Sequence, residues 1–129
     1  AVEHIQPMPA LRSTAPLLGS GAGLKRWLIE HTGGLGLARE LRRRVIAHNP
    51  ALLGIYDFKQ TDYRKLMQGW LACVPAEGAL MLCHPGGVSS IGARDPIGAA
   101  RVRELNYFSS EDFAQDLAAA DVTLGSVWR

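Results

Sequence analysis

A histidine stands at the end of a short apolar run, Ala79 to Cys83, and is followed by a proline and two glycines. A run this short, and apolar at every position, predicts a strand buried on both faces, as in a parallel sheet. His84 would then lie at the carboxyl end of that strand, where parallel α/β folds bind their ligands. The imidazole could transfer a proton near neutral pH, or it could simply hydrogen-bond a loop carbonyl, and its position alone leaves both roles open.

Asp57 ends the preceding predicted strand, at the same edge of the sheet. If the two strands are neighbours, its carboxylate could come within hydrogen-bonding reach of His84, orient the imidazole and stabilise its charged form. The alternative is that Asp57 starts the turn into the next helix, which is a common role for aspartate. The spacing alone favours this alternative.

The elements that must position these two residues alternate between strands and helices. In order, they are a strand over 52–57, a helix over 61–74, a strand over 79–84, a helix over 95–107, a helix from 110 and a strand over 122–128. Thr61 and Asp95 are expected to cap two of the helices, and Ser109 to Asp112 resemble a capping box for the third. The alternation predicts an α/β fold with a parallel sheet. Three strands make a narrow sheet, which points to part of a larger sheet or barrel.

The first fifty residues are less regular. Prolines and glycines interrupt the first 23 residues, which contain a candidate strand over 2–6, and a helix is expected over 24–31. A second helix begins near Leu37 and places four residues on one face, namely Leu37, Leu41, Val45 and His48. Its other face is basic and carries Arg39, Arg42 and Arg43. That face is either a solvated surface or a contact with an anionic membrane surface or an acidic substrate.

The composition is that of an ordinary soluble protein, with 47% hydrophobic and 20% charged residues. The length of 129 residues predicts a single or partial domain, with an irregular and helical part over 1–50 and a β/α part over 51–129. A formal charge of +2 gives no reason to expect a nucleic-acid partner. No apolar run is long enough to cross a membrane, and no secretory signal is recognised. Cys73 and Cys83 lack metal-type spacing, so we expect both to be reduced core residues of a cytoplasmic protein.

Several segments together resemble the C-terminal part of the YdjC-like carbohydrate deacetylases, nearest to the branch associated with hopanoid biosynthesis. They are Gly54-Ile55-Tyr56-Asp57, Leu82-Cys83-His84-Pro85-Gly86, and then the stretches 95–105, 108–113 and 119–124. The resemblance covers Leu52 to the C-terminus well and the first fifty residues only loosely. Each motif alone is modest, but their order and spacing together are fairly specific.

The resemblance implies an irregular (β/α) barrel of a bacterial enzyme that removes acetyl groups from N-acetylated sugars. The cofactor would be a divalent metal, Mg²⁺ or Zn²⁺, which polarises the amide carbonyl and activates a water. The substrate implied by the nearest branch is an N-acetylglucosaminyl hopanoid. His84 matches the family's His-Pro-Gly position and takes the role of protonating the leaving amine. Asp57 matches a polar position that is often followed by Ser-Gly, whereas Phe58 and Lys59 follow here.

The metal motifs of that family, an N-terminal Asp-Asp pair and histidines from the middle of the chain, do not occur in this sequence. We therefore expect the chain to be the C-terminal portion of such a deacetylase, to bind no metal by itself and to be inactive alone. A second copy is expected to cover its sheet edges. The competing hypothesis is a non-catalytic binding module that self-associates or contacts a membrane through the basic helix. A third hypothesis, a small metal-free enzyme that uses Asp57 and His84, lacks a convincing nucleophile.

Overall fold

The computed structural model describes four parts of the chain, which are residues 10–19, 27–28, 30–87 and 95–125. Its elements are, in order, the irregular helical turn η1 (Glu30–Gly34), α2 (Leu35–Arg43), β1 (Leu52–Leu53), α3 (Tyr63–Leu71), β2 (Leu80–Met81), α4 (Gly98–Phe108) and α5 (Glu111–Ala119). The predicted α/β class with parallel strands is confirmed for these residues. The strand predicted over 2–6 and half of the helix predicted over 24–31, namely residues 24–26 and 29, lie outside them.

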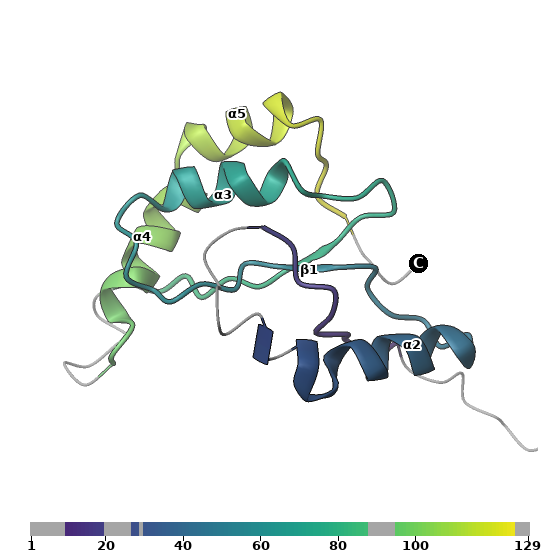
Figure 1. Cartoon of the computed structure of the whole chain (residues 1–129). Coiled ribbons are helices and arrows are strands. Elements are labelled where there is room, and N and C mark those ends of the chain that lie inside the picture. The colour runs from purple at the N-terminus through teal and green to yellow at the C-terminus, as the bar shows by residue number, and fades with distance from the viewer. Residues whose placement is uncertain (1–9, 20–26, 29, 88–94, 126–129) are drawn as a thin grey trace, which may run out of the picture.

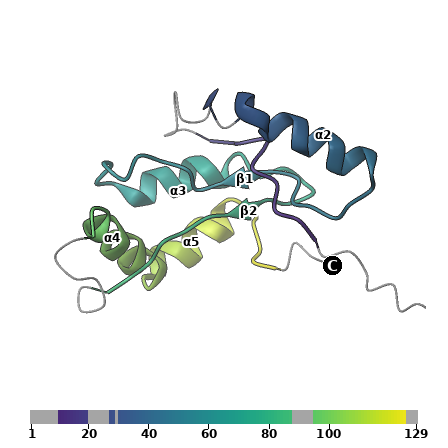
Figure 2. The ribbon, with the colours of Figure 1, turned by 90° about the horizontal axis from the view of Figure 1, so that it is seen from below.

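The helices lie on the two sides of the short sheet (Figure 1). Helices α3, α4 and α5 pack against one another on one side. Helix α2 lies on the other side, and the view from below also sets it apart from the three packed helices (Figure 2). Helix α2 therefore belongs to a different surface from the three packed helices.

The sheet consists of β1 and β2, which run parallel with Leu52 opposite Leu80 and Leu53 opposite Met81. On its other edge, β1 meets the N-terminal segment through a parallel bridge between Leu17 and Leu52. The sequence does not predict this neighbour, because a segment rich in proline carries no strand pattern. Both edges of β1 are thus occupied.

Asn49 holds the N-terminal segment against the sheet. Its side-chain amide donates to the carbonyls of Ser13 and Ala51 at 3.0 and 2.8 Å, and its side-chain oxygen accepts the Ser13 N–H at 2.8 Å. Asn49 and Ser13 are both fully buried. Because a buried amide must be paired to be tolerated, this set of bonds fixes where the segment runs.

Both strands are shorter than predicted. β1 ends at Leu53 instead of Asp57 because Gly54 adopts a φ of +87°, which is outside the extended region. A Cβ atom at Gly54 would overlap the carbonyl oxygen of Leu82, so the glycine also allows the two chains to approach closely. β2 ends at Met81, and the Leu82 N–H still donates to the Leu53 carbonyl at 3.0 Å. The chain then reaches His84 without regular pairing.

Helix α3 supplies most of the core. Its apolar residues recur at helical spacing and are buried at Tyr63, Leu66, Met67, Trp70 and Leu71. The helix is capped by Asp62, whose carboxylate accepts the Lys65 N–H at 3.0 Å, and the prediction of Thr61 as the cap is wrong. It ends before the predicted Val74, where the chain tightens into a turn ahead of Pro75.

The two C-terminal helices differ from prediction at their starts. α4 begins at Gly98, because Asp95 shapes the preceding turn: its carboxylate accepts the Ile97 N–H at 3.0 Å and the Arg101 Nε–H at 2.8 Å. The predicted capping box of α5 is not formed. The Ser110 hydroxyl donates to the carbonyl of Tyr107 at 2.7 Å instead of capping the helix.

The carboxylate of Asp116 joins the three packed helices. It accepts two hydrogen bonds from Arg64, one from Gln68 and one from Tyr107, all at 3.0 Å. The bonds from Arg64, and then those from Gln68 and Tyr107, lower the pKa of this carboxyl group although burial opposes the shift. We call these four side chains the Asp116 cluster.

The prediction that Val45 and His48 lie on a helix face is wrong. α2 ends at Arg43, and its buried face consists of Ala38 and Leu41. Val45 has a φ of +56° and is 90% exposed, and His48 lies beyond it in an extended segment. The chain therefore leaves the helical conformation before either residue can share that face.

The predictions for the two cysteines and for the last strand also need correction. Cys73 and Cys83 are free thiols, but both are exposed instead of lying in the core. Cys73 comes just after α3 ends, and Cys83 lies in the unpaired stretch after β2, so neither is enclosed. In the strand predicted over 122–128, the described residues 122–125 form no strand, and the rest lies outside the described residues.

Candidate active site

His84 lies where the chain leaves the sheet, and its backbone is held by α4. Its N–H donates to the carboxylate of Glu104, and its carbonyl accepts from Arg101 at 3.3 Å. The Gly86 N–H in turn donates to the Arg101 carbonyl at 3.2 Å. The turn after the apolar strand is therefore fixed to one helix, which gives the imidazole a defined position.

Glu104 is the residue that most distinguishes this site. It projects from the middle of α4 and is fully buried. One carboxylate oxygen accepts the Tyr56 hydroxyl at 2.6 Å, and the other accepts the His84 N–H. Burying a carboxylate is costly unless it is hydrogen-bonded, so these two donors are what make the position tolerable.

The same carboxylate faces the imidazole ring. Oε1 of Glu104 lies 3.8 Å from Nδ1 of His84, a distance at which a protonated imidazole would form an ion pair. Nδ1 is buried and has no hydrogen-bond partner among the described residues. The ring meets Phe58 edge-on, with centroids 5.3 Å apart. About a third of the side chain is exposed, so the Nδ1 side is enclosed while part of the ring remains accessible.

Tyr56 donates its hydrogen bond to Glu104 from within the core. It lies just before Asp57 and is 2% exposed, beside Trp70 in the aromatic cluster. Burial, and then the hydrogen bond and charge of Glu104, raise the pKa of the Tyr56 hydroxyl above its ordinary value. Tyr56 therefore stays protonated at neutral pH and remains a donor to the carboxylate.

Asp57 is not brought to His84. It is exposed, and its carboxylate accepts the N–H of Lys59 at 3.0 Å, which is the local turn bond expected of an aspartate at the start of a turn. No hydrogen bond or ion pair joins the described side chains of Asp57 and His84, and the carboxylate that faces the imidazole belongs to Glu104. A catalytic role for Asp57 stays a prediction.

Sequence reasoning did not identify Glu104, although a signal exists. Ala100, Glu104 and Tyr107 follow one another at helical spacing, and all three are buried in α4. A glutamate in the middle of an otherwise apolar stripe indicates a carboxylate with a dedicated partner. The sequence does not identify His84 as the partner of Glu104, because the two residues are distant in sequence and meet only through the path of the folded chain.

Cys83, next to the histidine, is not an activated nucleophile. Packing around the thiol, and then the charge of Glu104, raise its pKa although the residue as a whole is exposed. A thiol with a raised pKa is protonated at neutral pH and reacts poorly. The remaining candidate for proton transfer at this edge is therefore the imidazole of His84.

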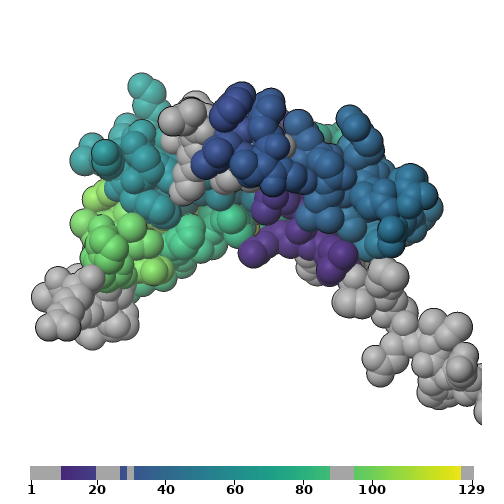
Figure 3. Space-filling model, turned by 60° about the horizontal axis from the view of Figure 1, so that its bottom comes forward, coloured from purple at the N-terminus to yellow at the C-terminus, as the bar shows by residue number. Residues whose placement is uncertain are grey.

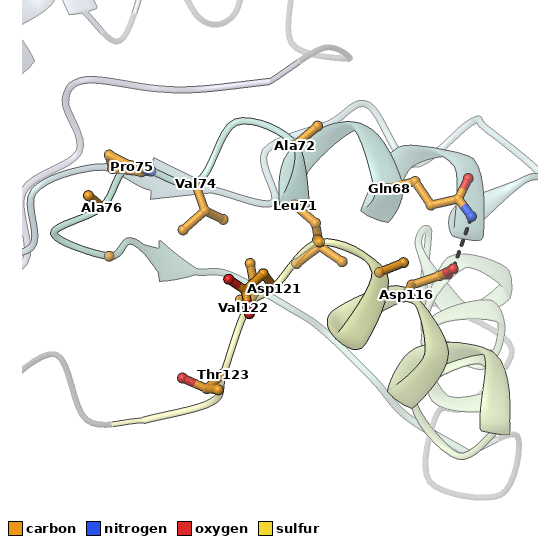
Figure 4. A pocket seen from close by; sticks show the side chains of 13 residues that line it. Gln68, Leu71, Ala72, Val74, Pro75, Ala76, Asp116, Asp121, Val122 and Thr123 are labelled. Carbon is orange, nitrogen blue, oxygen red and sulfur yellow. Dashed lines mark hydrogen bonds between the residues drawn. The ribbon is translucent and has the colours of Figure 1, made fainter.

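Two hollows in the described part of the surface lie away from the imidazole. One of about 600 Å³ lies between the end of α3 and α5, with Leu71, Val74 and Val122 in its wall and the Gln68–Asp116 hydrogen bond at its rim (Figure 4). Another, of about 500 Å³ and mainly apolar, lies against β2 and α5. His84 and Glu104 line neither of them. Within the described residues, the candidate site is thus a partly exposed imidazole beside a buried carboxylate.

Among the residues that the structure describes, no group of three or more His, Cys, Asp or Glu side chains could hold a metal ion. Within the same residues, no helix combines the length and apolar character needed to cross a membrane. Comparisons of the chain with protein-family models, curated proteins and solved structures found no match.

Proposed function

We propose that this chain is the histidine-bearing β/α portion of a metal-dependent carbohydrate N-deacetylase of the YdjC-like kind, in which His84 protonates the leaving amine. The observation that carries the proposal is the pairing of a half-exposed imidazole, after a parallel strand, with the fully buried carboxylate of Glu104. A fixed imidazole with an anion behind it is the arrangement that acid catalysis by histidine uses.

Hydrolysis of an acetamide needs such a group. Water adds to the carbonyl carbon, the C–N bond breaks, and the nitrogen must receive a proton because an amide anion is too basic to leave. Glu104 occupies the Nδ1 side of His84. The proton for the amine would therefore come from Nε2, and the products would be acetate and the free amino sugar.

The parallel β1–α3–β2 unit supports the proposal that the chain belongs to an irregular (β/α) barrel. We assign activation of the water to residues outside those described, among which no group of three or more His, Cys, Asp or Glu side chains could hold a metal ion. In this proposal the remaining part of the barrel supplies the metal site, and this chain supplies the acid. The substrate class is an N-acetylated sugar, and the motif resemblance points to an N-acetylglucosaminyl hopanoid.

Reconstitution tests the proposal. The purified chain would be mixed with the N-terminal part of a YdjC-like deacetylase that carries the metal motifs, and acetate release from N-acetylglucosamine oligosaccharides would be measured. We expect release from the mixture with Mg²⁺ or Zn²⁺, its loss on chelation, and no release from either part alone. A mixture without activity, under conditions in which the intact deacetylase turns over, would contradict the proposal.

A further inference from the structure

The segment from Trp27 to Val45 carries an unusual share of the exposed apolar side chains. Of the eight large hydrophobic residues that are exposed in the described chain, five lie in this segment. They are Trp27 at 55%, Leu28 at 52%, Leu35 at 43%, Leu37 at 45% and Val45 at 90% exposure. We call this set the α2 surface. Single exposed leucines are ordinary, but a group within one segment indicates a contact surface.

Arginines interleave with these apolar residues. Glu40 is paired with Arg43 and Arg44, whose hydrogen bonds lower its pKa to about 2, so its carboxylate offsets one of these two positive charges. Arg39 and Arg42 are exposed and have no carboxylate partner among the described residues. The α2 surface therefore carries a net positive charge among its apolar groups, to which Arg39 and Arg42 contribute without a carboxylate partner among the described residues.

The helix places Leu35 together with the two arginines. Leu35, Arg39 and Arg42 follow i, i+4, i+7 spacing and form one exposed stripe of α2, next to the stripe of Ala38 and Leu41 that is buried against the protein. The space-filling view shows α2, in dark blue, lying across an outer face of the molecule beside the N-terminal segment in purple (Figure 3). An extended flat partner could thus approach the whole stripe at once.

Independently of the proposed enzyme function, we infer that the α2 surface binds a bilayer that contains anionic lipids. Exposed Trp and Leu side chains beside Arg are typical of helices that lie in a membrane interface. The apolar groups would insert among the headgroups, and the guanidinium groups would bind lipid phosphates. A second copy of the chain fits less well, because a two-fold interface would place the arginine stripe of one copy against that of the other.

The test is co-sedimentation of the chain with phosphatidylcholine vesicles, with and without phosphatidylglycerol. We expect binding that requires phosphatidylglycerol and weakens with added salt. The double substitution Arg39→Gln/Arg42→Gln should reduce the affinity about fivefold per arginine, or about 25-fold in total. Lys59→Gln/Lys65→Gln removes the same charge from exposed positions elsewhere and should leave binding within about twofold.

A second pair of variants tests the apolar part. Leu35→Ser should weaken vesicle binding, whereas Leu105→Ser, at an exposed leucine of α4, should not. Circular dichroism would verify that all variants are folded. Equal binding by the arginine and lysine variants, equal binding to both vesicle types, or no binding would overturn the inference. So would a dimer, seen by light scattering, that Leu35→Ser dissociates while vesicles do not bind.

Discussion

At the scale of single residues, the site depends on how hydroxyls and amides meet one buried carboxylate. Tyr56 and the His84 backbone both donate to Glu104. The ring of Tyr63 lies 5.9 Å from that of Tyr56, and its hydroxyl is buried without a hydrogen-bond partner among the described residues. Both tyrosines are buried, and only Tyr56 bonds to Glu104. They therefore separate the contribution of the hydrogen bond to Glu104 from that of aromatic packing.

We expect Tyr56→Phe to lower the free energy of unfolding by about 1–3 kcal/mol, because it removes a hydrogen bond to a charged group and leaves part of Glu104 unpaired. Tyr63→Phe is the matched control. It removes an unpaired buried hydroxyl and should leave the stability unchanged or raise it. Urea unfolding of both variants measures the difference, and equal losses would mean that the Glu104 bond is not special.

The residue scale also shows how far the sequence could lead. The apolar run and the proline-glycine turn predicted that His84 ends a parallel strand, whereas the strand ends at Met81 and His84 lies shortly after it. The carboxylate partner of His84 was not predicted, since Asp57 and Glu104 are equally plausible as partners until the backbone path is known. The Asp57 carboxylate accepts a hydrogen bond from the Lys59 N–H in its own turn, as aspartates at turns commonly do.

At the scale of elements, two strands depend on one glycine. Gly54 has a positive φ, and the space for its Cβ is taken by the Leu82 carbonyl. The apolar pattern over 52–57 predicted a longer strand because periodicity registers which residues are apolar and not where the backbone must bend. Helix α3 was predicted more closely, because its stripe repeats over several turns and its core contacts agree with it.

Gly54→Ala should reduce the free energy of unfolding by about 2–4 kcal/mol through backbone strain and the overlap with Leu82. Gly36→Ala in α2 is the matched control, because a Cβ there meets nothing within 4 Å. That substitution should stabilise the helix by up to about 1 kcal/mol. Thermal or urea unfolding measures both, and a tolerated Gly54→Ala would contradict the close approach of the chains.

The Asp116 cluster makes the packing of α3, α4 and α5 sensitive to acid. The pKa of Asp116 is lowered in the folded chain, chiefly by Arg64. The stabilisation is therefore complete above the carboxyl's ordinary pKa of about 4 and is lost as the pH falls through the lowered value. Asp116→Asn should cost about 1–3 kcal/mol at neutral pH, and its difference from the wild type should shrink below about pH 4.

Urea midpoints between neutral and acidic pH check this behaviour. Glu77→Gln, which removes one exposed carboxylate in the turn after α3, is the matched control for the loss of a single charge. Its stability should follow that of the wild type at every pH. A constant gap between Asp116→Asn and the wild type down to low pH would show that the charge of Asp116 does not stabilise the helices.

At the scale of the whole molecule, the chain has two separate surfaces. The candidate site lies with α4, and the α2 surface belongs to the other side of the sheet (Figure 1). The sequence predicted the alternation of strands and helices and the basic character of α2. It did not predict the N-terminal segment as the neighbour of β1, because that pairing is made by the Asn49 and Leu17 contacts and has no periodic signal. Contacts of this kind, between segments distant in sequence, could not be predicted from the sequence pattern.

The most direct test of the account is the effect of His84→Gln on acetate release by the reconstituted enzyme. If His84 protonates the leaving amine, the rate should fall about 10²- to 10⁴-fold, the usual contribution of a general acid. Asp57→Asn, assayed in parallel, should change the rate only a few-fold, because its carboxylate bonds its own turn. A His84→Gln mixture that releases acetate as fast as the wild type would contradict the assignment of His84 as the acid.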